Sequence, residues 1–164
     1  VNRASSILSK DISRSEKIEE LKIIAKETVD ITGVGFYSLG SARKTLDNNQ
    51  IKQYLKLFEK YFLKSFTSRL TDYSDPKINV ISAETVSPKY TIVKTMLIAT
   101  TKKPEVKIDW RVYTKDPSKP LIRDLIVEGL SLARTQKEEF ASILSSNNDD
   151  MNALFSSLEK FINQ

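Results

Sequence analysis

The sequence of 164 residues contains no cysteine and no histidine. Without cysteine the chain has no disulfide, no thiolate nucleophile and no thiolate metal ligand. Without histidine it also lacks the commonest general base and the commonest transition-metal ligand. It has only four glycines and five prolines, which excludes a collagen-like or linker-like chain. Most familiar catalytic constellations are therefore excluded, and the only metal sites left open are those built from carboxylates.

Long hydrophobic runs are also missing. No apolar stretch approaches the roughly 18 residues that a membrane-spanning helix needs, and the longest candidate, residues 90–99, is interrupted by Lys94. With 40% hydrophobic and 9% aromatic residues, the composition is that of a folded soluble protein. The length predicts one domain over residues 1–164, of which residues 1–14 form either a loose arm or a helix.

The charge is unevenly distributed along the chain. The formal net charge is +5, and residues 76–120 carry nine basic but only four acidic side chains. Such a basic segment attracts anionic headgroups or acidic partner surfaces, although a solvated surface is the simpler interpretation. The aromatic residues follow apolar stripes and are not interleaved with basic ones, so no nucleic-acid partner is expected. The basic side chains of interest are Lys94, Lys102, Lys103 and Lys107.

Helical periodicity dominates the first part of the chain. Ser15 is a candidate N-cap for a helix that runs to about residue 30, and residues 31–39 predict a short helix that Gly40 ends. Gly33 and Gly35 form a G-x-G pair, but no strand precedes it and no third glycine follows. The pair is therefore not a nucleotide-binding fingerprint.

The strongest pattern lies between residues 47 and 73. Large apolar side chains recur there at steps of three and four, while lysines recur at steps of four. At 100° per residue the two rows lie on opposite sides, which predicts one long amphipathic helix. The lysines are Lys52, Lys56, Lys60 and Lys64.

After residue 76 the apolar period changes from helical to alternating, which indicates strands. Four strands are expected, at 77–83, 89–99, 105–114 and 119–128, joined by hairpin-length connections into an antiparallel meander. We expect Gly129 to end the sheet in a sharp turn into a helix capped by Ser131. A last helix is expected after Asp149 or Asp150. The fold class is therefore α+β, with helices packed on a four-stranded antiparallel sheet.

The run from Asp124 to Leu132, DLIVEGLSL, followed by Phe140, resembles the MlaC family. This family consists of periplasmic phospholipid-binding proteins of an ABC transport system that maintains outer-membrane lipid asymmetry, and its pattern is approximately D-x-x-x-E-G-V-S-L. Leu39-Gly40 after a short helix is similar to the family as well. The chain departs from the pattern where Pro120 replaces a Trp, Arg123 a Tyr, and Gln136-Lys137 a Tyr-Arg pair.

The resemblance implies an MlaC-like (NTF2-like) fold with an apolar pocket between sheet and helices. It implies a periplasmic carrier, its signal peptide removed, that shuttles phospholipid between an inner-membrane ABC transporter complex and an outer-membrane lipoprotein complex. Contact with these membrane complexes would be transient. No catalysis, metal or cofactor is implied, because the phospholipid is cargo.

Residues from both the helical and the strand stripes are expected to line the pocket. The face of each strand that points inward stays open, because the strand at 89–99 is apolar on both faces. The expected lining residues are Phe36, Phe58, Phe62, Phe66, Val93, Met96, Ile108, Trp110, Val112, Leu125 and Val127.

Two alternatives remain. A divergent member would carry another lipid, such as a hopanoid. Alternatively, the same curved sheet would hold a small ligand or an Asp–Tyr pair for proton transfer. A deep apolar cavity favours lipid, whereas a small one with Asp or Tyr at its floor favours catalysis. The catalytic candidates are Asp30, Asp109, Asp124, Glu128, Tyr37, Tyr54 and Tyr113, and their spacing selects no pair.

Overall fold

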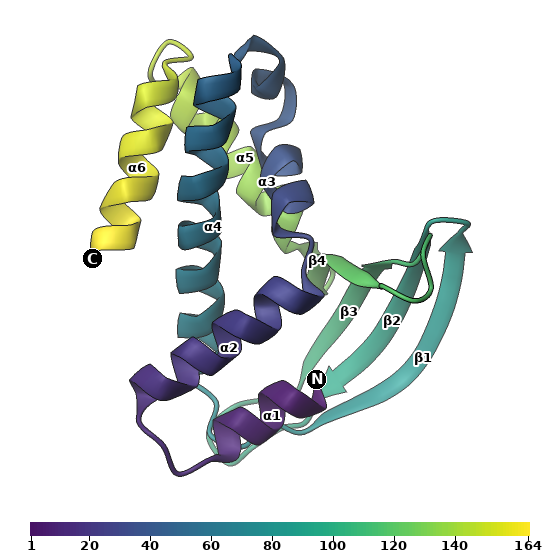
Figure 1. The fold of residues 1–164 in the computed structure, drawn as a ribbon. Coiled ribbons are helices and arrows are strands. Elements are labelled where there is room, and N and C mark those ends of the chain that lie inside the picture. The colour runs from purple at the N-terminus through teal and green to yellow at the C-terminus, as the bar shows by residue number, and fades with distance from the viewer. The chain divides into compact units, whose positions relative to one another are not determined.

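The computed structural model describes all residues from Val1 to Gln164, and the chain divides into two compact units (Figure 1). The sheet unit comprises Val1–Asp30 and Phe66–Leu132. The helical unit comprises Ile31–Ser65 and Ala133–Gln164. None of the helices combines the length and the apolar character that crossing a bilayer requires.

The sheet unit contains an antiparallel meander. Its strands β1 (Ile78–Ser87), β2 (Tyr90–Leu97), β3 (Val106–Tyr113) and β4 (Leu121–Val127) confirm the four predicted strands and their order. The predicted number of strands is wrong, however, because a fifth strand, β5 (Leu130–Ser131), pairs with β4. The alternating pattern revealed the four long strands, but two residues are too few to show a period.

The turn between β4 and β5 explains this correction. Glu128 and Gly129 both have positive φ, 49° and 82°, as the two central residues of a type I′ hairpin turn do. The right-handed twist of such a turn returns the chain antiparallel to β4. Gly129 therefore turns the chain from strand to strand, not from strand to helix as predicted, and α5 begins only at Leu132.

The long strands are bent. The β1–β2 pairing shifts register at Ile81 and at Val86, and the β3–β4 pairing shifts at Arg123. A bulge of this kind bends its strand and increases the local twist. The resulting curvature of β1 is visible in Figure 1.

Two helices complete the sheet unit. The first, α1 (Asn2–Ser9), shows that the N-terminal segment is a helix, and it packs on α2 (Arg14–Thr28) through Ile7, Leu8 and Leu21. The N-cap of α2 is Ser13, not the predicted Ser15. A capping box fixes this start, because the Ser13 hydroxyl accepts from the backbone N–H of Glu16 while the Glu16 carboxylate accepts from the backbone N–H of Ser13.

The end of α2 is attached to the sheet. Val29 forms a parallel bridge with Ile122 of β4, and the N–H of Asp30 donates to the carbonyl of Ile122 over 2.9 Å. The edge of β4 beside Ile122 is therefore paired with this segment, while the edge near Val127 is paired with β5.

The helical unit contains the remaining helices. Confirming the predicted helices, α3 (Ile31–Leu39) ends at Gly40, whose φ is +59°, and α4 (Asn48–Leu70) is one long helix that continues into the sheet unit. The short helix η1 (Gly40–Thr45) links them. The other two are α5 (Leu132–Ser145) and α6 (Met151–Asn163). Asp150 caps α6 by accepting from the N–H of Asn152.

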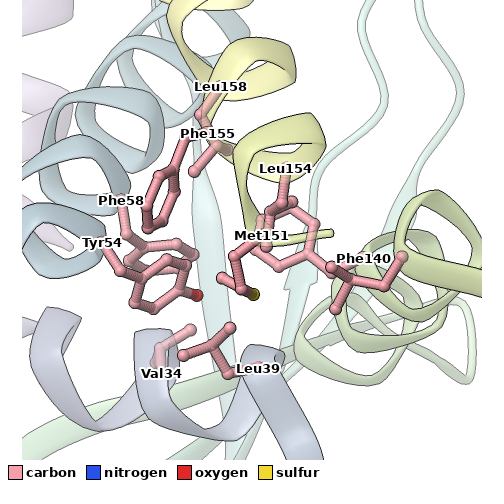
Figure 2. Packing of buried hydrophobic residues seen from close by; sticks show 10 residues of the cluster. Val34, Leu39, Tyr54, Phe58, Phe140, Met151, Leu154, Phe155 and Leu158 are labelled. Atoms are coloured by element: carbon pink, nitrogen blue, oxygen red, sulfur yellow. The ribbon is translucent and has the colours of Figure 1, made fainter. Parts of the chain in front are cut away.

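The core of the helical unit is filled by its own side chains (Figure 2). Tyr54 and Phe58 of α4 lie at its centre, and Phe140 of α5 meets both rings edge to face. The phenol of Tyr54 donates to the carbonyl of Gly35 over 2.7 Å. The buried residues of this core are Val34, Leu39, Tyr54, Phe58, Phe140, Leu144, Met151, Leu154, Phe155 and Leu158.

Candidate functional site

One face of the sheet gathers most of the predicted lining residues. Directly opposed residues in antiparallel strands share a face. Val93 lies opposite Trp110, and Trp110 lies opposite Leu125, so one apolar row crosses β2, β3 and β4. A second row joins Thr95, Ile108 and Val127 in the same way. The predicted residues on this apolar sheet face are Val93, Ile108, Trp110, Val112, Leu125 and Val127.

Met96 lies on the other face. It sits opposite Lys107 of β3 and Asn79 of β1, and its neighbours Thr95 and Leu97 point to the apolar sheet face. The sequence did not show which face of β2 is on the apolar side of the sheet, and the pairing register with β3 shows it. The structure therefore separates Met96 from the other six strand residues expected to line the pocket.

The apolar sheet face is incompletely covered. No residue of β3 or β4 is fully buried, although both are interior strands of the sheet. In β2 only Thr95 and Leu97 are buried, at 1% and 6% exposure. Thr95 and Leu97 are thus packed at one end of β2, while the other apolar side chains that β2, β3 and β4 place on this face are half-buried.

The polar atoms on this face bond to one another. The indole N–H of Trp110 donates to the hydroxyl of Thr95 over 2.9 Å, and that hydroxyl donates to the carbonyl of Ile108 over 2.7 Å. At the other end of β2, the hydroxyls of Thr91 and Thr114 form a hydrogen bond of 3.0 Å. These groups are satisfied, so the face offers hydrocarbon rather than hydrogen bonds to a ligand.

The four predicted phenylalanines are divided between the units. Phe58 is 1% exposed in the core of the helical unit, and Phe62 packs partly buried against the same core. Phe36 lies in the same unit beneath the guanidinium of Arg43, which is 5.0 Å from the ring centre. Phe66 is half-buried and belongs to the sheet unit. Their part in a common pocket with the strand residues stays a prediction.

The opposite face of the sheet carries charged and aromatic side chains. The guanidinium of Arg123 bonds to the carboxylate of Asp30 and the phenol of Tyr90, each over 2.8 Å, and stacks 3.9 Å from the ring centre of Tyr113. Partial burial opposes the charge of Arg123, but these hydrogen bonds outweigh it and raise its pKa. Asp30 and Tyr113, two of the catalytic candidates, thus contact the same arginine.

The remaining catalytic candidates also have structural partners. The carboxylate of Asp109 lies 3.8 Å from the ammonium of Lys107, and Tyr37 lies beneath the ammonium of Lys137. Tyr54 is a core residue whose pKa is raised by burial, which keeps its phenol neutral. No group of three or more acidic side chains is positioned to hold a metal ion.

Comparison with known proteins gives a family and a fold. The family model described as MlaC protein matches residues 1–160. The chain belongs to the MlaC family. A solved structure of a phospholipid-binding protein from Ralstonia solanacearum, in complex with a phospholipid, superposes with a TM-score of 0.83 at 15% sequence identity. The match covers 99% of this chain and 92% of that one, and it supports the α+β fold. No curated protein sequence matches.

The MlaC-like run of residues has a structural role in the β4–β5 hairpin. The carboxylate of Asp124 accepts from the hydroxyl of Ser131, and the carboxylate of Glu128 accepts from the backbone N–H of Lys107 on β3. Gly129 supplies a positive φ to the turn between them. The motif therefore fixes the β4–β5 hairpin and ties its turn to β3, and its polar side chains bond to the protein itself.

Two departures from the MlaC pattern also have partners. Arg123 contacts Asp30, Tyr90 and Tyr113 on the face of the sheet opposite the apolar sheet face. Gln136 accepts a hydrogen bond from the phenol of Tyr61 over 2.7 Å, which links α5 to α4. The aliphatic part of Lys137 lies against Gly40, where an added Cβ would be 3.0 Å from Lys137 Cε. These substitutions are accommodated by local packing within each unit.

Proposed function

We propose that this MlaC-family protein is a periplasmic phospholipid carrier that holds acyl chains against the apolar sheet face. Two findings support the proposal. The chain belongs to the MlaC family, and a protein of the same fold was solved in complex with a phospholipid. The phospholipid is cargo, so no cofactor and no catalytic step are part of the proposal.

The observation that carries the proposal is the half-buried state of β3 and β4. Interior strands of a domain with a filled core bury their apolar side chains. The helical unit has such a filled core, built from ten buried residues. Here Trp110, Leu125 and Val127 remain half-buried, while their polar neighbours are already satisfied. A face of this kind gains free energy from hydrocarbon and little from a polar ligand.

The energies are suited to reversible transfer. Each buried CH₂ group gains about 0.8 kcal/mol, so two acyl chains gain on the order of 20 kcal/mol. A bilayer offers the same chains a similar gain. The proposed shuttle moves phospholipid between an inner-membrane ABC transporter complex and an outer-membrane lipoprotein complex. Exchange between such similar environments is nearly balanced, so it is reversible.

The test compares two glutamate substitutions in the same strand. Val93→Glu puts a carboxylate on the apolar sheet face, whereas Met96→Glu puts it on the opposite face across from Lys107. Lipid is extracted from each purified protein with organic solvent and counted by mass spectrometry. We expect Val93→Glu to lower the bound lipid at least about tenfold, because an unpaired carboxylate is costly beside hydrocarbon, and Met96→Glu to keep it.

Two results would count against the proposal. One is wild-type protein that carries no lipid and takes none up from labelled phospholipid vesicles. The other is a folded Val93→Glu variant that is loaded as fully as Met96→Glu. The mass of the extracted lipid also distinguishes a phospholipid from another lipid such as a hopanoid.

A further inference from the structure

A hollow lies in the sheet unit, next to the Leu97 end of β2. It has a volume of about 360 Å³ and lies between the segment after α4, the start of β1 and the loop from β2 to β3. Three lysines line it, Lys77, Lys102 and Lys103. Leu97 lines it too, and this side chain is buried at 6% exposure. None of the half-buried residues of the apolar sheet face lines the hollow.

The loop that carries two of these lysines is held in a fixed conformation. The hydroxyl of Thr100 accepts from the backbone N–H groups of Lys102 and Lys103, over 3.3 and 3.1 Å. The backbone N–H of Thr100 donates to the carbonyl of Lys103 over 2.8 Å, which closes the turn. The loop therefore presents its lysines from a hydrogen-bonded turn.

One lysine ammonium is also positioned. Lys103 Nζ lies 3.8 Å above the ring centre of Tyr73 and donates to the carbonyl of Asp72 over 3.2 Å. Both contacts stabilise the charged ammonium at the wall of the hollow. An ammonium has three N–H donors, so this lysine keeps donors for a ligand.

The acidic residues of the hollow are engaged elsewhere. Asp72 pairs with Arg14 at 3.7 Å, and Asp75 accepts from the hydroxyl of Ser9 over 2.9 Å. Neither Lys77 nor Lys102 has a carboxylate partner, in contrast to Lys10, which pairs with Glu20. With three lysines against two aspartates, one of which pairs with Arg14, the hollow carries a net positive charge.

We propose that this hollow, bounded by Lys77, Lys102 and Lys103, binds the phosphate group of a phosphate ester. Lysine is a common phosphate ligand, acting as a compact point charge, and the volume suits a phosphate with a small organic substituent. The ester belongs either to a headgroup at a lipid surface or to a small soluble molecule. The site is separate from the acyl-chain face and does not depend on the carrier function.

The test follows the backbone amide signals of Thr100–Lys103 by NMR while a ligand is added. The ligands are inorganic phosphate, glycerol 3-phosphate, and phosphatidylcholine vesicles with and without phosphatidylglycerol. The Lys102→Gln/Lys103→Gln variant removes two charges from the hollow. Lys52→Gln/Lys56→Gln removes the same two charges from exposed positions of α4 and is the matched control.

We expect the hollow variant to bind roughly tenfold more weakly, and the control to change less than about twofold. The single variant Lys77→Gln should weaken binding without touching the loop. Response to inorganic phosphate or glycerol 3-phosphate but not to vesicles assigns the site to soluble phosphates. Response only to vesicles, with or without phosphatidylglycerol, assigns it to headgroups, and response to both kinds of ligand supports phosphate recognition itself. Equal losses in the hollow variant and the control, or no shift at Thr100–Lys103 with any ligand, would overturn the proposal.

Discussion

At the scale of single residues, the packing of α3 against α4 depends on the missing side chain of Gly35. A Cβ built at this position would lie 2.8 Å from Cδ1 of Phe58, which is closer than a Cβ contact allows. Phe58 is 1% exposed in the core and has no space to retreat. The G-x-G pair in the sequence thus includes a glycine required for close helix packing.

Gly35→Ala should therefore destabilise the protein. Overpacking a filled core costs about 1–3 kcal/mol, while replacing glycine by alanine in a helix returns about 1 kcal/mol, so we expect a net loss of about 1 kcal/mol. Urea unfolding of Gly35→Ala, Phe58→Leu and the double variant measures it. Because the smaller side chain relieves the clash, the two losses should be less than additive. Strict additivity would contradict the contact.

Because the phenol of Tyr54 is buried, we expect the free energy of unfolding to fall at alkaline pH. Burial, with a smaller contribution from Tyr61, raises its pKa in the folded protein. Since the folded pKa exceeds the unfolded one, the stabilisation is complete below about pH 10, the ordinary tyrosine value, and is lost as the pH rises above it. There the stability should fall by up to about 1.4 kcal/mol per pH unit.

Tyr54→Phe is the matched variant, because it removes the titrating group. It should lose about 1 kcal/mol at neutral pH, with the hydrogen bond to Gly35, and should show a shallower decline in urea midpoints between pH 9 and 11. Parallel declines in the two proteins would mean that Tyr54 ionises without unfolding.

At the scale of secondary structure elements, the start of α2 is decided by a pair of side chains. Ser13 and Glu16 bond reciprocally, whereas Ser15, the cap expected from the sequence, lies inside the helix. Ser13→Ala should cost about 1 kcal/mol and lower the melting temperature by about 2–4 °C. Ser15→Ala, which removes the same hydroxyl two residues later, should leave the melting temperature almost unchanged. Equal effects would show that the capping box adds nothing.

The same pair gives a prediction at acid pH. Hydrogen bonds from the Ser13 hydroxyl and backbone lower the pKa of Glu16. A lowered folded pKa means that the stabilisation is present above the ordinary glutamate pKa and is lost as the pH falls through the folded value. Ser13→Ala should therefore destabilise the protein less at pH 3 than at pH 7 in thermal melts. An equal difference at both pH values would contradict the role of the charged carboxylate.

Most elements could be predicted from periodicity, and the exceptions have physical reasons. The amphipathic stripe of α4 and the alternation of β3 extend over enough residues to reveal their period. The two residues of β5 do not, and the turn before it uses Glu128, an uncommon residue at positive φ. The sequence did not show which side chains of β2 lie on the apolar sheet face, because Val93 and Met96 are both apolar. Only the register of pairing with β3 distinguishes them.

At the scale of the whole molecule, the sequence suggested the family through one short run of residues, and the family match over residues 1–160 confirms it. The run itself builds the β4–β5 hairpin. The proposed ligand-binding surface comes instead from scattered apolar positions such as Trp110 and Leu125. Such positions look the same in sequence whether a core is filled or not, because periodicity reports which face is apolar and not what covers it. The half-buried state of β3 and β4 required the structure.

Contact between acyl chains and the apolar sheet face can be measured with a probe that the chain itself supplies. Trp110 is the single tryptophan of the sequence and lies in the middle of this face. Protein from which bound lipid has been extracted is loaded with phospholipid brominated along its acyl chains or with its unbrominated equivalent, and tryptophan emission is recorded. Bromine quenches indole fluorescence on contact, so we expect weaker emission with the brominated lipid in wild type and Met96→Glu. Equal emission from the two loaded forms would show that the acyl chains do not contact this face.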